Sequence, residues 1–160
     1  LLAPLQVTTD VNLGVPALLP EEYCPDVHER LSLYKRFAAT HDFSELMDLR
    51  EELIDRFGSL PDPAKSFYET HRLRLEMADY GIKKIDASPL AIQMHFIPNP
   101  PIDPLRIIQL IQTQAHIQLN GQDRLKITPP KARDFDQLEQ RLEQIRQVLK
   151  RLNQSALSTV

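Results

Sequence analysis

The sequence predicts an α+β fold built as a single domain, and three observations support that class. Helical periodicity and strand-like alternation occur in separate blocks of the chain, without the regular strand–helix–strand order of a doubly wound sheet. Capping residues, Asp-Pro pairs and an Asn-Gly turn separate these blocks. The length of 160 residues, with 42% apolar and 26% charged side chains, suits one globular domain with a buried core.

The first third of the chain predicts a strand followed by two helices. Apolar side chains alternate over 5–13, as in a half-buried strand, and the prolines that follow end it. Apolar residues at helical spacing predict a helix over 26–39. A second helix is predicted over 42–58, because Asp42 and Glu45 have capping-box spacing and a glycine stands at its end. Its apolar stripe consists of Leu46, Leu49, Leu53 and Phe57.

The central third predicts one helix and a pair of short strands. Asp62 and Pro63 supply an N-cap and a first-turn proline for a helix over 62–78. The expected buried face of this helix consists of Ala64, Phe67, Tyr68, His71, Leu75 and Ala78. The runs 82–85 and 90–97 are typical of a strand pair, since the second alternates in period two with Leu90 on its apolar side.

The last third predicts a helix, a hairpin and a long amphipathic helix. An Asp-Pro pair starts a helix over 103–115. The Asn-Gly pair at 120–121 is the strongest hairpin-turn signal in the chain and predicts antiparallel strands at 116–119 and 124–127. Apolar residues spaced alternately three and four apart predict a last helix over 134–152.

These elements predict three segments of the chain. They are an N-terminal strand with a Pro-rich lead-in at 1–24, a compact α+β domain at 25–152 and a frayed tail at 153–160. Because the chain begins with Leu instead of Met, we expect it to be a fragment of a longer protein. Part of its function then belongs to that parent.

Composition narrows the classes of function. The formal net charge of −3 gives the molecule as a whole no positive field to attract nucleic acid or anionic lipid. The single cysteine excludes an internal disulfide framework and suits the cytoplasm. No apolar run approaches the roughly 20 residues of a membrane-spanning helix. We therefore expect a soluble cytoplasmic protein.

The sequence contains no recognisable catalytic, cofactor or metal motif. Its four glycines are dispersed, so it has no glycine-rich phosphate loop, and its five histidines never recur at helical pair spacing. Cys24 and His28 are four residues apart, but they supply only two of the four ligands that a tetrahedral metal site needs. His71 lies on an apolar helix face without a nucleophile motif, which favours a core histidine. We expect no catalytic, cofactor-binding or metal-binding residues.

The helix predicted over 42–58 has an acidic face. At about 100° per residue, four carboxylates fall within roughly an 80° sector beside the leucine stripe. They are Glu45, Asp48, Glu52 and Asp55, called the acidic face below. Only Arg56 is expected close enough on that flank to neutralise it. The face is either an ordinary solvated surface or a strip that pairs with a partner's arginines, and Asp48, Glu52 and Asp55 are the candidate partner-binding residues.

Basic residues near the last helix offer an alternative function. They are Lys131, Arg133, Arg141, Arg146, Lys150 and Arg151. Acidic residues are interspersed among them, and mixed charges opposite an apolar seam are typical of a solvated helix face. An accessory nucleic-acid-binding domain is therefore the alternative, and an enzyme with an unrecognised pocket is the third option.

Two stretches resemble a known family. They are LGVPALLPEEYCPDVHERLSLYKRFA at 13–38 and ELIDRFGSLPDPA at 52–64. With the hairpin NGQDRLKI at 120–127, the chain resembles the C-terminal domain of the bacterial transcription-repair coupling factor over nearly its whole length. Cys24 differs from the family pattern, but as a small apolar replacement it leaves the implied function unchanged.

This resemblance implies a parent protein that recognises RNA polymerase stalled at DNA damage. The parent would displace the polymerase with an ATP-driven DNA translocase and recruit the excision-repair protein UvrA. For this domain the resemblance implies regulation: it docks on the UvrB-like N-terminal module of the same polypeptide, covers the UvrA-binding surface there and restrains the translocase. The motor is not in this chain, so we expect no enzyme activity, no cofactor and no membrane contact.

Overall fold

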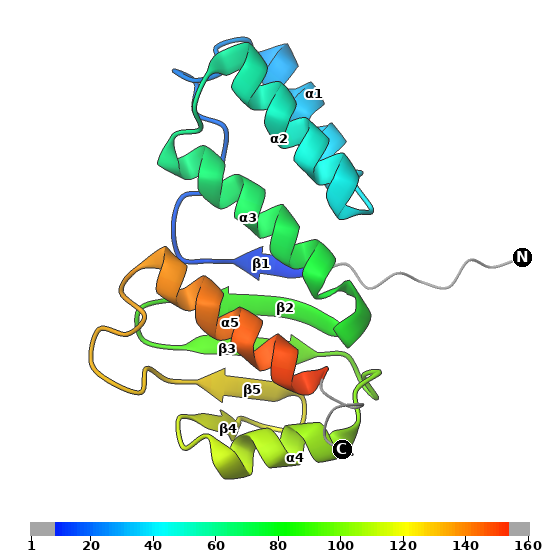
Figure 1. Cartoon of the computed structure of the whole chain (residues 1–160), viewed down its shortest axis with the longest axis vertical. Coiled ribbons are helices and arrows are strands. Elements are labelled where there is room, and N and C mark those ends of the chain that lie inside the picture. The colour runs from blue at the N-terminus through cyan, green and yellow to red at the C-terminus, as the bar shows by residue number, and fades with distance from the viewer. Residues whose placement is uncertain (1–8, 154–160) are drawn as a thin grey trace, which may run out of the picture. The chain divides into compact units, whose positions relative to one another are not determined.

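A computed structural model describes residues 9–153 and confirms the α+β class, with five α-helices and one five-stranded mixed sheet in that part of the chain (Figure 1). These residues form two compact units. The sheet unit comprises 9–14 and 77–153, and the helical unit comprises Val15–Glu76. The first half of the strand expected over 5–13 and most of the expected tail lie outside the described residues, so the expected segment boundaries stay predictions.

The sheet unit confirms both predicted strand pairs and joins them. Its strands are β1 (Asp10–Asn12), β2 (Ile82–Ala87), β3 (Ile92–Phe96), β4 (Ile117–Leu119) and β5 (Arg124–Ile127). Their order in the sheet is β1-β2-β3-β5-β4, with β1 parallel to β2 and all other neighbours antiparallel. The register aligns Ile85, Met94 and Leu125 across three strands, and all three are fully buried on one face.

The predicted strand over 90–97 is longer than the observed β3, which leaves out Leu90, Ala91 and Ile97. Leu90 is 82% exposed, although the alternation assigned it to the apolar side. The reason is local, because the Ser88 hydroxyl oxygen accepts hydrogen bonds from the main-chain N–H groups of Leu90 and Ala91, at 3.1 and 3.3 Å. This side-chain turn delays β3 until Ile92.

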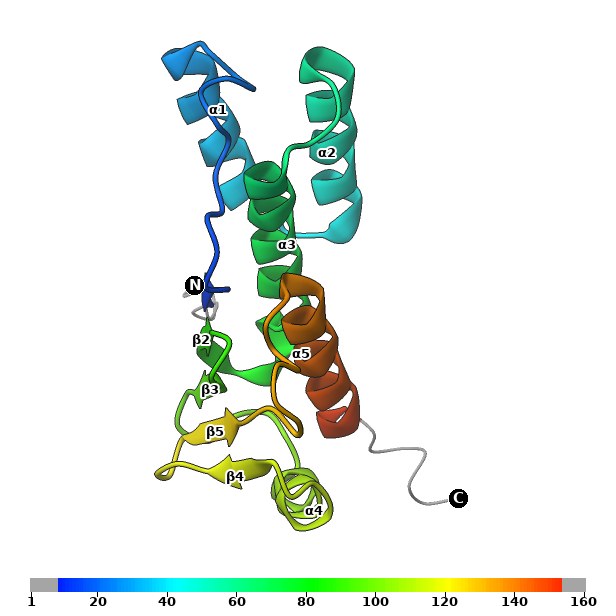
Figure 2. The ribbon, with the colours of Figure 1, turned by 90° about the vertical axis from the view of Figure 1, so that its left-hand side faces the viewer.

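Two helices cover the same side of the sheet (Figure 2). The helix α4 (Pro104–Thr113) starts as predicted, since the Asp103 carboxylate accepts a hydrogen bond from the main-chain N–H of Leu105 at 3.0 Å. The helix α5 (Leu138–Leu152) packs through an apolar stripe. The buried apolar residues of α5 are Leu142, Ile145, Val148, Leu149 and Leu152.

The last helix begins four residues later than the predicted start at Asp134. Gln137 has an extended backbone, and its main-chain N–H donates to the Gln140 side-chain oxygen at 2.8 Å, which caps α5 at Leu138. Before this cap, Arg133 has a φ of 71°, which interrupts any helix. The apolar periodicity therefore extends beyond the helix into a turn segment.

Arg141 connects three parts of the sheet unit. Its side chain is almost fully buried and donates hydrogen bonds to the carbonyl oxygens of Phe135 and Leu13, at 2.8 and 2.7 Å. Gly14 follows with a φ of 73°, and a Cβ there would lie 2.5 Å from the Ala87 carbonyl oxygen. The guanidinium therefore joins α5, the turn before it and the chain after β1. Position 14, next to this contact, accepts only glycine, because of its positive φ and the close carbonyl oxygen.

The helical unit consists of the three predicted N-terminal helices. They are α1 (Val27–Ala38), α2 (Phe43–Phe57) and α3 (Asp62–Glu76). Asp26 and Asp42 cap the first two by accepting hydrogen bonds from the main-chain N–H groups of the residues two and three positions on, at 2.9 and 2.8 Å. Ala78 does not join the buried face predicted for the third helix, because α3 ends at Glu76 and Ala78 is exposed in the 3-10 turn η1 (Ala78–Tyr80).

Replacing Arg141 with Met is expected to destabilise the chain by about 2–4 kcal/mol, because it leaves buried carbonyl oxygens without donors. Urea unfolding followed by circular dichroism measures the change. Lys150→Met, on the exposed side of the same helix, is the control and should change stability by less than about 0.5 kcal/mol. Equal effects of the two variants would contradict the proposed role of Arg141.

Candidate partner-binding surface

Leucine burial fixes the orientation of α2 and therefore of its acidic face. Leu46, Leu49 and Leu53 are buried in the core of the helical unit. At helical spacing the acidic residues then lie toward α1 or on the outside. The structure thus keeps the four carboxylates on one side of α2 but gives them different surroundings.

Glu52 is bound by arginines of its own unit. Its two carboxylate oxygens each accept a hydrogen bond from Arg36 of α1 at 2.7 Å, and Oε2 accepts another from Arg56 at 3.1 Å. Arg56 also pairs with Glu29 of α1. The expectation that only Arg56 neutralises the acidic face is therefore wrong, because a second arginine reaches Glu52 from the neighbouring helix.

The contact between Arg36 and Glu52 shifts the pKa values of both side chains so that the charged forms are favoured. The hydrogen bond from Arg36 lowers the pKa of Glu52, and the same bond raises the pKa of Arg36. Because the side chains are 32% and 46% exposed, solvent screens much of the attraction. Glu52 is thus an ionised and firmly oriented carboxylate on a partly exposed surface.

Asp48 and Asp55 present the opposite situation. Both are exposed, and neither carboxylate forms a hydrogen bond or an ion pair within the part of the chain that the structure describes. Seven residues apart, they lie two turns from each other on the outer side of α2. Met47 is 57% exposed on the adjoining flank. The outer side of α2 therefore offers two free carboxylates and an apolar side chain.

His71 has a structural role. It packs between the rings of Phe37 and Phe67, and its Nδ1 accepts a hydrogen bond from Arg74 at 3.3 Å. Burial lowers the pKa of His71 to about 4, so the ring is neutral at physiological pH. Arg74 in turn donates to the Thr40 hydroxyl at 3.0 Å, close to the end of α1. The core interpretation of His71 agrees with this geometry.

The weak metal candidate gains no support. Cys24 is buried, and burial raises the pKa of its thiol, while His28 is exposed on α1. Within residues 9–153 no three His, Cys, Asp or Glu side chains are grouped so that they could hold a metal ion. No helix in this range is both long and apolar enough to cross a membrane.

The basic residues near α5 are less available than the sequence suggests. Arg141 is buried, and Arg133 pairs with Asp136, with 2.8 Å between Nε and Oδ2. Arg146 has an interaction partner as well, so three of the six basic residues counted for nucleic-acid binding are engaged. Lys131, Lys150 and Arg151 have exposed positions.

Comparison with known proteins identifies the family. A model of the TRCF domain matches residues 13–107, more than half of the chain. The chain belongs to the TRCF domain family. The match includes all three helices of the helical unit together with β2 and β3 of the sheet unit, and so contains the whole acidic face.

Transcription-repair-coupling factors from two bacterial species are similar in sequence to this chain. This TRCF domain is 37% identical to the Escherichia coli transcription-repair-coupling factor over 151 residues, which are 94% of the chain and 13% of that relative. It is 43% identical to the Haemophilus influenzae factor over 109 residues, 68% of the chain and 10% of that relative. The chain therefore spans a small part of the curated relatives.

A solved structure supports the fold. The crystal structure of the C-terminal domain of a transcription-repair coupling factor aligns with a TM-score of 0.71 and covers 94% of this chain and 97% of that one. Sequence identity in this alignment is 20%, so the likeness establishes the fold. The family resemblance noted in the sequence is confirmed.

Sequence reasoning about this TRCF domain missed Arg36. The sequence contained a signal for it. An acidic and a basic residue on α1, Glu29 and Arg36, have charges complementary to those of Arg56 and Glu52 on α2. These charges can be paired only once the antiparallel alignment of α1 and α2 is known, and spacing within one helix does not give that alignment. The structure supplies this alignment.

A double-mutant cycle with Arg36→Gln and Glu52→Gln should give a coupling energy of about 1 kcal/mol at neutral pH, as for a well-aligned, partly exposed ion pair. Because the folded-state pKa of Glu52 is lowered, this contribution is present above the pKa of the unfolded carboxyl group, about 4.3. It should be lost as the pH falls through the folded-state pKa. Urea unfolding at several pH values measures the coupling.

The matched control for this cycle is Glu51→Gln, the next residue on the same helix. Glu51 is exposed, and among residues 9–153 its carboxylate pairs only with the neighbouring Arg50, at 3.4 Å. Its removal should cost less stability than that of Glu52 and should show no coupling to Arg36. A pH-independent coupling would contradict the assignment of the interaction to the ionised Glu52.

Proposed function

We propose that this TRCF domain is a non-catalytic regulatory domain of a transcription-repair coupling factor. It docks reversibly on the UvrB-like N-terminal module of the same polypeptide, covers the UvrA-binding surface of that module and restrains the ATP-driven DNA translocase of the cytoplasmic parent. RNA polymerase and DNA are partners of that parent. The names of the curated relatives and the small share of their length that this chain spans support the proposal.

The observation that carries the proposal is the pair of free carboxylates on the outside of α2. Asp48 and Asp55 are exposed without partners among the described residues, on a helix whose other side is firmly packed. Arginine is the complementary residue, because its guanidinium binds carboxylates through two parallel hydrogen bonds. An arginine-rich surface of the N-terminal module therefore fits this side of α2.

Glu52 adds a second mode of contact. It already accepts hydrogen bonds from Arg36 and Arg56, so a partner arginine must either join this cluster or replace one of them. Replacement exchanges one charge pair for another and changes the free energy little, which suits a reversible interaction. Asp48 and Asp55 then supply most of the attraction, and Glu52 orients the partner.

The accessory nucleic-acid-binding function remains the alternative. It rests on the exposed Lys131, Lys150 and Arg151. A DNA titration at several salt concentrations distinguishes it, because phosphate contacts give a steep salt dependence. Docking through the acidic face requires no DNA affinity of the isolated chain.

Changing Asp48 and Asp55 together to Asn should weaken binding of this chain to the separate N-terminal module by about 2 kcal/mol, roughly thirtyfold, and leave stability unchanged. Both positions are exposed, so the substitution removes charge without disturbing the core. Isothermal titration calorimetry measures the affinity, and thermal unfolding measures the stability.

The control variant changes Glu21 and Glu22 together to Gln. These residues are exposed in a loop of the same helical unit, so the control loses the same net charge at another place. It should weaken docking by less than about threefold, by long-range attraction alone. Equal weakening by both double variants would mean that α2 is an ordinary solvated surface.

Deleting this domain from the intact parent should raise the apparent affinity for UvrA by the inverse of the open fraction, because only open molecules bind. An open population of about 1% gives roughly a hundredfold gain. By linkage, UvrA must weaken docking of the domain by the same factor. Surface plasmon resonance with intact and truncated parent measures the first effect.

The reciprocal effect is measured by titrating UvrA into a preformed complex of the N-terminal module and this chain. Displacement of the chain is the expected result. Equal affinity of intact and truncated parent for UvrA, without displacement, would exclude masking as the function.

A further inference from the structure

One side of α5 carries a stripe of three side-chain amides and one arginine that the proposed function does not use. The stripe consists of Gln140, Gln144, Gln147 and Arg151, at spacings of four, three and four, which place all four on one side of the helix. We call this side the amide groove. It spans 12 residues, or about 16 Å along the helix axis.

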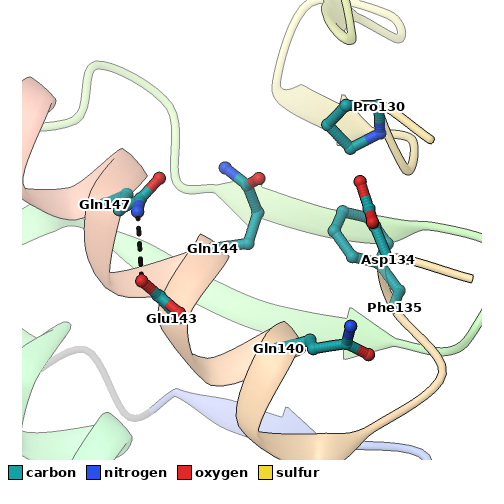
Figure 3. A pocket seen from close by; sticks show the side chains of 7 residues that line it. All are labelled: Pro130, Asp134, Phe135, Gln140, Glu143, Gln144 and Gln147. Atoms are coloured by element: carbon teal, nitrogen blue, oxygen red, sulfur yellow. Dashed lines mark hydrogen bonds between the residues drawn. The ribbon is translucent and has the colours of Figure 1, made fainter.

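Two hollows lie along the amide groove. The first, of about 240 Å³, is bounded by the three glutamines, by Glu143 and by the turn segment that contains Asp134 (Figure 3). The second, of about 250 Å³, is bounded by Arg151 and by Arg106, Gln109 and Thr113 of α4. Both belong to the sheet unit, and Gln147 and Arg151 place them one helical turn apart.

The hydrogen-bonding capacity of this groove is only partly used inside the chain. The side chains of Gln144 and Arg151 form no hydrogen bond or ion pair with any described residue. The side-chain amide of Gln147 donates to Glu143 at 3.5 Å, a long contact (Figure 3). Gln140 uses its oxygen in the cap of α5 and keeps its amide N–H groups. Donors and acceptors are therefore available along the whole groove.

Charge divides the groove into two ends. Asp134 and Glu143 lie at the end near the start of α5, and Arg106 and Arg151 lie at the end near its C-terminus. The stretch between them is lined by neutral amides. A ligand that fits this surface has a positive group, a series of neutral hydrogen-bonding groups and a negative group, in that order along about 12–16 Å.

We propose that the amide groove binds an extended peptide segment with a basic side chain at one end and an acidic side chain about four residues away. Main-chain N–H and C=O groups of an extended peptide match side-chain amides, which both donate and accept. At about 3.3 Å per residue, four residues span about 13 Å and return the side chain to the same face. The acidic side chain contacts Arg151 and Arg106, and the basic one contacts Glu143 and Asp134.

The same charges disfavour a nucleic-acid strand. A strand bears a phosphate at every nucleotide and would meet Asp134 and Glu143 at one end of the groove. Like charges at close distance are unfavourable, and the basic end alone spans too short a length for a strand. The groove lies in the sheet unit and the acidic face in the helical unit, so this inference is independent of the proposed docking.

The test uses the isotope-labelled 160-residue chain and capped pentapeptides of defined charge. The probes are Lys-Ser-Ala-Ser-Glu and its reverse, because the groove does not fix chain direction, with Gln-Ser-Ala-Ser-Gln as the neutral control. At millimolar peptide, at least one charged probe should cause saturable NMR shifts of Gln144, Gln147, Thr113 and Arg151. The neutral probe should bind about tenfold more weakly.

Two variants of α5 make the test specific. Arg151→Gln should weaken the charged probe about fivefold, whereas Lys150→Gln, which removes the same charge from the neighbouring residue on another side of the helix, should not. Arg151→Glu should reverse the preference, so that a probe with Lys at both ends binds better than the Lys–Glu probe.

Three results would overturn the proposal. They are shifts of equal size with charged and neutral probes, equal effects of Arg151→Gln and Lys150→Gln, and absence of shifts in the groove with every peptide. Salt-sensitive shifts of the groove with a short oligothymidylate and none with the peptides would assign this surface to nucleic acid instead.

Discussion

The burial of one leucine stripe fixes the geometry on which the candidate surface depends. Once Leu46, Leu49 and Leu53 enter the core of the helical unit, the rotation of α2 about its axis is set. Rotating the helix would expose these leucines at a cost of about 1.5–3 kcal/mol each, more than any surface ion pair can return. The directions of Asp48, Glu52 and Asp55 therefore follow from apolar packing.

The charge network between α1 and α2 then divides the acidic face into a paired and an unpaired part. Arg36 and Arg56 bind Glu52, and Arg56 also binds Glu29, so the two helices are joined along one flank. Each contact is partly exposed and individually weak. Their combined effect is to hold Glu52 in one orientation while Asp48 and Asp55 stay unpaired among the described residues, which is the arrangement that the proposed arginine contact uses.

The sheet unit is organised around a buried, hydrogen-bonded arginine. Arg141 places a charged group inside the unit and satisfies it with carbonyl oxygens from the turn before α5 and from the chain after β1. Such a buried cation is stable only when its hydrogen bonds are complete, so it specifies one arrangement of these segments. The opposite side of α5 lacks this constraint, and its amides are only partly used inside the chain, which leaves room for the proposed peptide.

Local sequence signals alone determined the fold class, the three N-terminal helices, the Asp caps of the first two, both antiparallel strand pairs and the position of the acidic face on α2. Caps and apolar periodicity act within one or two turns, so the residues that decide them are close in sequence. Only the tertiary structure decided that Arg36 binds Glu52, that Arg141 is buried instead of facing solvent and that β1 lies parallel to β2. The last two depend on contacts between residues more than 70 positions apart, and the first on how α1 aligns with α2, none of which local spacing encodes.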